Sequence, residues 1–424
     1  VFLLGRLSIP GQTADVWGYV DSSTGKEFAL VGYGIFTDPP NAGVIIADVS
    51  NPSNPIQVAN INSVPGFDVK NWQHYIYAVN GGSQGFGSIV DISNPENPIV
   101  VGSMPSSHNI FIDKRGFMYL ECPGLKIFNL NPDPTNPELI WSDGTLACHD
   151  ATVIDNRLYD FHGTGGTNIY DITDPRDPEL LGSITDPAIQ FHHSGWPTED
   201  GQFLFICDEG ARELTEDFTV WDISDVGNPQ KVGGFADVNA IVHNLFVVGN
   251  FAFTSYYTAG LRIFDISEPK NPIFVDEFDT SMLSGENFAG AFGVYPFAPS
   301  GNIYVSDEQE GLFIFGFNDP TTSVDTKSPD LPAQFALFDN YPNPFNPATT
   351  ISYKLPKTAP VNLVIYNPLG QPIKTLLNSV QSAGTHLVVW DGQNDSGKQV
   401  SSGIYFYRIK TLNFKATKRM LLLK

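Results

Sequence analysis

The sequence predicts an all-β protein, in which a seven-bladed β-propeller closed by the N-terminal strand is followed by a small Ig-like β-sandwich. Three observations lead to this prediction. A hydrophobic strand, an acidic or polar turn and two prolines recur seven times; glycine and proline are abundant, at 39 and 32 of 424 residues; and the balance of charge reverses near residue 325.

The repeat is the most informative of these observations. An aspartate ends the hydrophobic strand in five of the seven copies, and successive copies lie 38 to 51 residues apart. The equivalent positions are Asp48, Asp91, Asn129, Asp171, Asp222, Asp265 and Gly316. A period of about 40–50 residues with several short strands per unit is typical of propeller blades. We therefore expect residues 1–318 to form a seven-bladed propeller.

The two ends of the repeat array predict how the ring closes. Residues 3–7 match the first strand of a repeat unit, and residues 312–317 match the last strand. If these segments pair, the N-terminal strand completes the final blade. Closure of this kind removes the exposed sheet edges that an open array would carry.

A different pattern follows the repeats. Residues 319–334 are rich in Asp, Pro, Ser and Thr, which predicts a linker, and residues 335–424 show short alternating segments separated by turns. The predicted strands are 349–355, 361–366, 373–376, 385–390, 403–409 and 418–422. Alternation at this spacing is typical of a small β-sandwich.

Charge divides the chain in the same place. Residues 1–325 contain 12 lysines and arginines against 42 aspartates and glutamates, a net of −30, whereas residues 326–424 contain 11 against 4, a net of +7. Such an acidic first part argues against nucleic acid or an anionic membrane as its partner. No apolar run of about 18 residues predicts a membrane span. The chain starts at Val1 without a basic, apolar leader, so we expect any signal peptide to have been removed.

The three cysteines are far apart and lack the spacing of a metal site. For Cys122, Cys148 and Cys207 we expect thiols buried in strands; a disulfide or a reactive nucleophile is the less favoured interpretation.

Residues 1–318 resemble the propellers built from LVIVD repeats, in particular the secreted choice-of-anchor B group. Besides the repeated strand, the resemblance is carried by His149-Asp150, His193-Ser194-Gly195-Trp196, Asp208-Glu209 and His243-Asn244. Members of that group carry varied membrane or cell-wall anchors. The resemblance therefore implies a location outside the cell or at its surface, without implying a molecular activity.

Residues 335–424 resemble a type IX secretion C-terminal sorting domain. The resemblance is carried by Tyr341-Pro342-Asn343-Pro344-Phe345-Asn346-Pro347, Trp390-Asp391-Gly392, Ser402-Gly403-Ile404-Tyr405 and Lys418-Arg419-Met420. It implies export across the outer membrane of a Bacteroidota-like bacterium, after which such a domain is often removed.

Six polar residues occupy one equivalent position of the repeat, the start of the inner strand, and Phe292 occupies the seventh. They are Asp15, Asp68, His108, His149, His193 and His243. Because inner strands line the central channel of a propeller, we expect these side chains to converge at one mouth. Neutral imidazole together with carboxylate suits Zn²⁺, Mn²⁺ or Fe²⁺. A water held on such a metal could hydrolyse a bond.

A structural role for this ring is the favoured alternative, because a polar residue at a fixed point of each blade can hydrogen-bond the neighbouring loop and bind nothing else. Two further acidic pairs, Asp208-Glu209 and Asp307-Glu308, could take Ca²⁺ together with loop carbonyls. Exposed carboxylates on the blade rim are the favoured interpretation of these pairs.

Two functions of different classes follow. The resemblance to a sorting domain and the lack of a nucleophile signature favour a secreted, non-enzymatic structural or binding protein, whose partners are copies of itself or cell-surface components. The charge split further predicts head-to-tail association into filaments through the C-terminal domain. The alternative is a metal-dependent hydrolase that uses the His/Asp ring.

Overall fold

The protein is described by a computed structural model that covers residues 1–35, 37, 39–82, 84–145, 148–210, 215–237, 239–319, 335–337, 340, 343, 345, 349–357, 359–381, 384–411 and 414–423. Contacts divide the chain into two compact units, Val1–Asn318 and Asp319–Lys424. All but the first residue of the predicted linker 319–334 lies outside the described residues, as do several residues of the segment 341–347. No helix among the described residues is long and apolar enough to cross a membrane.

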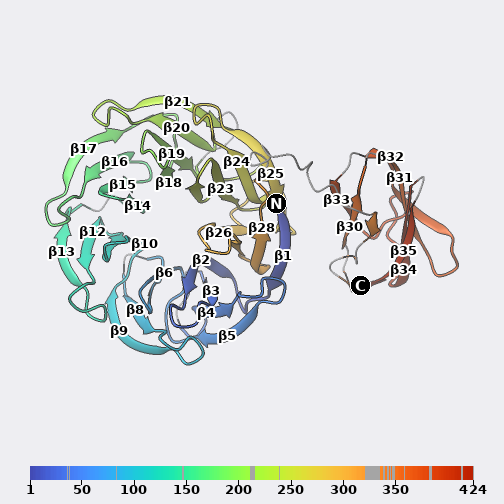
Figure 1. Ribbon diagram of the computed structural model, residues 1–424, viewed down its shortest axis with the longest axis horizontal. Helices are drawn as coiled ribbons and strands as arrows, with labels where there is room; N and C mark the ends of the chain where they lie inside the picture. Colours follow the sequence, from blue (N-terminus) through green and yellow to red (C-terminus); the bar gives the residue numbers. More distant parts are fainter. Residues whose placement is uncertain are drawn as a thin grey trace. The chain divides into compact units, whose positions relative to one another are not determined.

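In the first unit, the described residues form seven antiparallel sheets of four strands, arranged around a central axis as in a β-propeller (Figure 1). From the inner to the outer strand, the first four sheets are β2 (Thr13–Val20), β3 (Glu27–Tyr33), β4 (Gly43–Asp48) and β5 (Ile56–Ile61); β6 (Asp68–Trp72), β7 (Tyr75–Val79), β8 (Phe86–Asp91) and β9 (Ile99–Pro105); β10 (Asn109–Ile112), β11 (Phe117–Glu121), β12 (Lys126–Asn129) and β13 (Glu138–Ser142); and β14 (Asp150–Ile154), β15 (Arg157–Phe161), β16 (Thr167–Asp171) and β17 (Glu179–Ile184). The others are β18 (His192–Pro197), β19 (Phe203–Asp208), β20 (Phe218–Asp222) and β21 (Gln230–Phe235); β22 (Leu245–Val248), β23 (Phe251–Tyr256), β24 (Gly260–Asp265) and β25 (Ile273–Phe278); and β26 (Ala291–Tyr295), β27 (Ile303–Asp307), β28 (Gly311–Gly316) and β1 (Phe2–Leu7).

The N-terminal strand closes the ring, as the sequence predicts. β1 pairs antiparallel with β28, with Leu3 opposite Phe315 and Leu7 opposite Leu312. The last sheet therefore combines the two ends of the repeat array. The sequence repeat and the sheet are offset by one strand, because each repeat begins with the outer strand of the preceding sheet.

The repeated aspartates end the third strand of their sheets and stabilise the turn that follows. The Oδ1 atoms of Asp91 and Asp171 accept hydrogen bonds from the backbone N–H groups two residues later, at 2.8 and 2.7 Å, and Asn129 accepts one from Asn131 at 3.1 Å. Side chains of Asp and Asn favour turns through this local bond. The bonds from Thr173 lower the pKa of Asp171. The strongest sequence signal in the chain is thus structural.

Glycines in the outer strands let neighbouring sheets approach closely. A Cβ atom at Gly182 in β17 would lie 1.9 Å from the carbonyl oxygen of Val226, in the turn that precedes β21 of the next sheet. At Gly233 in β21 it would lie 2.3 Å from the carbonyl oxygen of Lys270. Only glycine allows this backbone approach, which fixes one blade against the next.

The second unit is the predicted Ig-like β-sandwich. One sheet contains β29 (Ala336–Leu337), β30 (Thr349–Leu355) and β33 (Gly384–Trp390); the other contains β32 (Pro372–Gln381), β31 (Ala359–Tyr366), β34 (Gly403–Lys410) and β35 (Lys415–Leu422). Alternate residues of both sheets, among them Ile351, Leu363 and Tyr407, form a separate buried core around Trp390. The all-β prediction, a propeller followed by an Ig-like domain, is confirmed.

Candidate functional site

Four of the six predicted ring residues form a continuous row at the channel. His108, His149, His193 and His243 lie in or just before the inner strands β10, β14, β18 and β22. The ring centroids of successive histidines are 4.5, 4.3 and 4.5 Å apart. The equivalent start of four consecutive inner strands brings these imidazoles together, as the repeat predicts.

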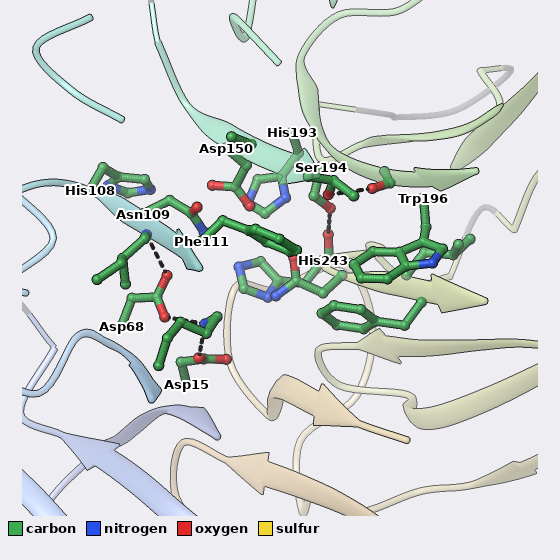
Figure 2. Close-up of a pocket in the computed structure, with 18 of the residues that line it drawn as sticks. Asp15, Asp68, His108, Asn109, Phe111, Asp150, His193, Ser194, Trp196 and His243 are labelled. Atoms are coloured by element: carbon green, nitrogen blue, oxygen red, sulfur yellow. Dashed lines mark hydrogen bonds and ion pairs between the residues drawn. The ribbon is translucent and has the colours of Figure 1, made fainter. Parts of the chain in front are cut away.

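The two predicted aspartates form a separate cluster around a lysine. Lys70 in β6 donates to Asp15 at 2.7 Å and also to Asp68, and all three side chains are buried (Figure 2). Burial lowers the pKa of Lys70, but the attraction of Asp15 and Asp68 outweighs it, so the net pKa is raised. The sequence contained a signal for the pairing of Lys70 with Asp68, because residues two apart in a strand lie on the same face. The structure thus assigns these carboxylates an internal partner.

Backbone carbonyl groups orient three of the four histidines. The Nδ1 atoms of His108, His149 and His243 lie 2.8, 3.0 and 2.6 Å from the carbonyl oxygens of Gly81, His193 and Phe292. A carbonyl oxygen only accepts, so each Nδ1 carries the proton and each Nε2 of a neutral ring keeps its lone pair. The bonds of His149 and His243 join adjacent sheets, which supports the structural interpretation. They also leave Nε2 available to a ligand.

Two carboxylates that the ring prediction did not include stand next to the histidines. One nitrogen or oxygen from each of His108, His149 and Asp150 lies within 4.8 Å of the others, and the same holds for His149, His193 and Glu209. The Nδ1 atom of His149 is 3.2 Å from Asp150, and the Nε2 atom of His193 is 3.7 Å from Glu209 Oε2. In the sequence, Asp150 directly follows the ring residue His149, and Glu209 directly follows Asp208 at the end of an aromatic strand. These neighbouring positions were the available signal.

These carboxylates set the charge of the row. Burial lowers the pKa of His149, but the negative charge of Asp150 and its hydrogen bond outweigh burial, and the net pKa is raised. For His193, burial and the neighbouring imidazoles His149 and His243 together lower the pKa well below its usual value. Burial also lowers the pKa of His108. The pKa of His149 is therefore raised, whereas the pKa values of its two neighbours in the row, His108 and His193, are lowered.

The cavity beside the row is small. It has a volume of about 60 Å³ and is lined by ring residues and inner strands (Figure 2). Aromatic side chains pack across the channel, with ring centroids of Trp196 5.1 Å from Phe246 and of Phe246 6.4 Å from Trp17, which belong to three different sheets. A few waters, an ion or a small anion fit this space, and a sugar or peptide does not.

The two acidic pairs are not the exposed rim carboxylates that the sequence predicts. Asp208 and Asp307 are buried, and their carboxylates are engaged by the chain. Backbone N–H groups of Gln190 and Phe191 donate to Asp208 at 2.8 Å each, and those of Gln309 and Glu310 donate to Asp307 at 3.0 and 2.9 Å. A carboxylate at the end of a strand can hold an adjacent loop in this way. Only Glu209 is left directed toward the histidine row.

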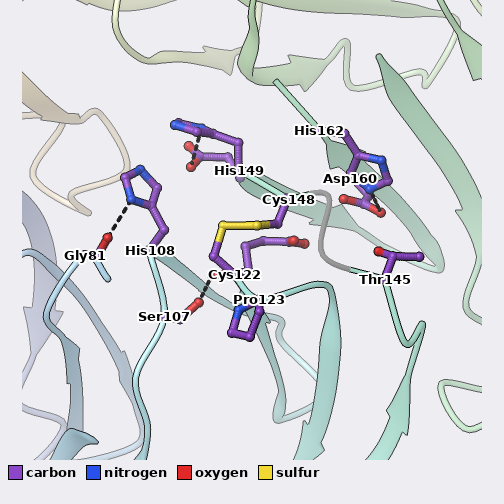
Figure 3. The surroundings of a disulfide bond; sticks show 12 residues. Gly81, Ser107, His108, Cys122, Pro123, Thr145, Cys148, His149, Asp160 and His162 are labelled. Carbon is purple, nitrogen blue, oxygen red and sulfur yellow. Dashed lines mark hydrogen bonds and ion pairs between the residues drawn. A yellow bond between two sulfur atoms is a disulfide. The ribbon is translucent and has the colours of Figure 1, made fainter. Parts of the chain in front are cut away.

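A disulfide joins two neighbouring sheets at the histidine mouth. Cys122, in the turn after β11, is bonded to Cys148, which directly precedes His149 (Figure 3). The expectation of three free thiols is therefore wrong for this pair and holds only for Cys207, which is free and buried. The cysteines are 26 residues apart in sequence. They meet because a turn after the second strand and the entry to the next inner strand lie at the same end of adjacent sheets.

Replacing both Cys122 and Cys148 by Ala is expected to lower the free energy of unfolding by about 3 kcal/mol, since the bridge closes a loop of this size in the unfolded chain. For a unit of this length, the melting temperature should fall by roughly 5 °C. Dithiothreitol should lower the wild-type melting temperature to that of the variant and leave the variant unchanged. A wild-type protein that melts identically with and without reductant would contradict the expected role of the bridge.

Comparison with known proteins agrees with both units. The LVIVD repeat family model matches residues 40–63, 84–105 and 241–280, and the FlgD Ig-like domain model matches residues 345–413. The first unit therefore contains LVIVD repeats, and the second contains an Ig-like domain. No curated protein matches the chain significantly.

Solved structures share the architecture at low sequence identity. The WD40 β-propeller domain of Doa1 is 13% identical, with 75% of this chain and 97% of that domain covered at a TM-score of 0.52. U3-55K is 8% identical, with 74% and 98% covered at 0.51. PorZ, a surface component of the type-IX secretion system of Porphyromonas gingivalis, is 13% identical at 0.49; 95% of this chain is covered, and the chain spans 58% of PorZ. At these identities the likeness to Doa1 and U3-55K concerns the fold alone.

Proposed function

We propose that the chain is an exported, non-enzymatic structural protein, whose propeller presents rigid surfaces outside the cell and whose Ig-like domain serves export and attachment. The observation that carries this proposal is the Cys122–Cys148 disulfide. Disulfides persist in oxidising compartments outside the cytosol. The LVIVD repeats and the sorting-domain motifs of residues 335–424 agree with this location.

The small cavity supports a structural rather than an enzymatic role. A volume of about 60 Å³ gives no room for an organic substrate inside the channel, and aromatic rings pack across it. The large surfaces of the propeller remain for recognition. Partners of such a protein are copies of itself or other cell-surface components.

Self-association is the specific form of this proposal. The outer face of β34 and β35 carries Arg408, Lys410, Lys415 and Arg419, opposite the buried row of Tyr405, Tyr407 and Ile409. Lys410 and Lys415 are exposed and directly opposite each other. The net charge of −30 on residues 1–325 is complementary to this basic face. A basic patch of one molecule that meets an acidic patch of another is a head-to-tail contact, which can continue into filaments.

We expect full-length protein to form assemblies at about 0.01 M salt that dissociate at about 1 M, where the screening length falls from about 30 to about 3 Å. Light scattering and negative-stain microscopy measure this. Changing Lys410→Glu and Lys415→Glu should abolish assembly. Changing Lys357→Glu and Lys398→Glu alters the net charge equally at exposed positions off this face and should leave assembly intact.

Self-association is wrong if the wild-type protein stays monomeric at low salt and high concentration. It also fails if the two double variants lose assembly equally, because the effect then belongs to net charge and not to the β34–β35 face.

A further inference from the structure

We propose that His149, His193 and Glu209 bind one divalent transition-metal ion at the mouth of the channel. One candidate ligand atom from each lies within 4.8 Å of the other two. The three residues come from different segments: His149 precedes β14, His193 lies in β18, and Glu209 directly follows β19. Two imidazoles and one carboxylate form a ligand set that suits Zn²⁺ or Fe²⁺ and leaves a position for water.

The groups around these ligands already orient them. The Nδ1 atom of His149 lies 3.0 Å from the carbonyl oxygen of His193, which leaves its Nε2 as the ligand atom. Tyr257 donates its hydroxyl hydrogen to Glu209 Oε1 at 2.5 Å, so that Oε2 faces His193. Hydrogen bonds of this kind to metal-binding histidines and carboxylates fix their direction and strengthen binding.

The burial of His193 beside Glu209 also favours a ligand at this place. The side chain is 4% exposed, its ring interacts with the backbone of His243, and its Nε2 atom lies 3.7 Å from Glu209 Oε2. A metal ion bound to Nε2 of His193 and to Glu209 would bridge the 3.7 Å between these two atoms.

The group of His108, His149 and Asp150 is the less suited of the two. The two groups share His149, so a single nitrogen of His149 cannot bind a metal ion in each group at the same time. Asp150 lies 3.2 Å from the Nδ1 atom of His149, so it already has a hydrogen-bond donor in that side chain. The side chain of Glu209 is 18% exposed and that of Asp150 is 11% exposed, so an ion reaches Glu209 more readily. The strongly acidic propeller attracts cations to this mouth.

The experiment uses the full-length protein, purified without chelator, stripped and then titrated with Zn²⁺ or Co²⁺ at pH 7.5. We expect one equivalent to bind, a Co²⁺ visible spectrum of a site with nitrogen and oxygen ligands, and a higher melting temperature with metal. His193→Ala and Glu209→Gln should each weaken binding by at least about 100-fold, more than the loss of a group that only orients a ligand. His74→Ala, which lies outside the row, should bind as the wild type does, and Asp150→Asn should weaken binding less than Glu209→Gln does.

Three results would overturn the assignment: no binding of Zn²⁺ or Co²⁺ by the wild type, unchanged affinity in Glu209→Gln, or a larger loss in Asp150→Asn than in Glu209→Gln. Circular dichroism and metal-free melting curves show which variants are folded. A folded Glu209→Gln decides the outcome even if His193→Ala does not fold. The inference is independent of self-association, which the β34–β35 variants test without touching this site.

Discussion

Deleting residues 1–9 is expected to destabilise the propeller more than any other change considered for this chain, by about 5 kcal/mol or more. Leu3, Leu4 and Leu7 are partly buried against the cores, and a fully buried aliphatic side chain contributes about 1.5–3 kcal/mol. Arg6 pairs with Glu310 and lies over the ring of Phe313 at 4.9 Å. The deletion also exposes the edge of β28. Thermal and urea unfolding of the truncated protein measure the loss.

A peptide of residues 1–9 added in excess should raise the melting temperature of the truncated protein, because its binding site on β28 is otherwise formed. A scrambled peptide of the same composition is the matched control and should do nothing. An unchanged melting temperature after truncation would show that β1 contributes nothing to closure.

Replacing Lys70 by Met should cost about 3–5 kcal/mol, since it leaves two buried carboxylates without their cation. Lys70 also lies over the ring of Trp17 at 4.6 Å, so the whole cluster of Asp15, Trp17, Asp68 and Lys70 depends on it. Lys26→Met is the matched control. Lys26 pairs with Asp48 at 2.8 Å on the surface, and its loss should change the melting temperature little. Equal effects of the two substitutions would contradict the expectation.

The loss in free energy of unfolding caused by Lys70→Met should depend on pH. Burial raises the pKa of Asp15 well above its usual value even though Lys70 opposes the shift. Without Lys70 the pKa rises further, and a carboxyl group whose folded pKa is raised stabilises the protein at low pH and loses that contribution as pH rises. We therefore expect the variant to be closest to wild type near pH 4 and to fall behind toward pH 8. Unfolding curves across this range test the sign.

The sequence predicted the fold because its signals are local. Each repeated aspartate is followed by a turn that its own side chain stabilises, as in Asp91 and Ser93. The repeated hydrophobic segment is the third strand of every sheet in the first unit. The match of residues 3–7 to an outer strand was enough to predict that the ring of sheets is closed. Alternation in residues 349–422 similarly matched strands β30 to β35 to within three residues at each end, except that β32 continues to Gln381, beyond the predicted end at 376.

The site was only partly predictable, because its chemistry depends on contacts between sheets. Alignment of the repeats brought the four histidines to one mouth, but it treated Asp15 and Asp68 as equivalent to them. The pairing of both aspartates with Lys70 follows from how β2 packs on β6, which no repeat position encodes. Glu209 lies in a loop outside the aligned position. The Cys122–Cys148 pair likewise became visible only when two sheets were placed side by side.

The pairing of β1 with β28 also fixes the order of events when the chain folds. Strand β1 cannot find its partner until Gly316 has been synthesised. Contacts over such a sequence separation form late and slowly, because the loop between them must close first. Until then both β1 and the edge of β28 remain unpaired, and unpaired edges invite aggregation. Ring closure is therefore the step at which a chaperone or an export apparatus would most readily delay folding or protect the chain.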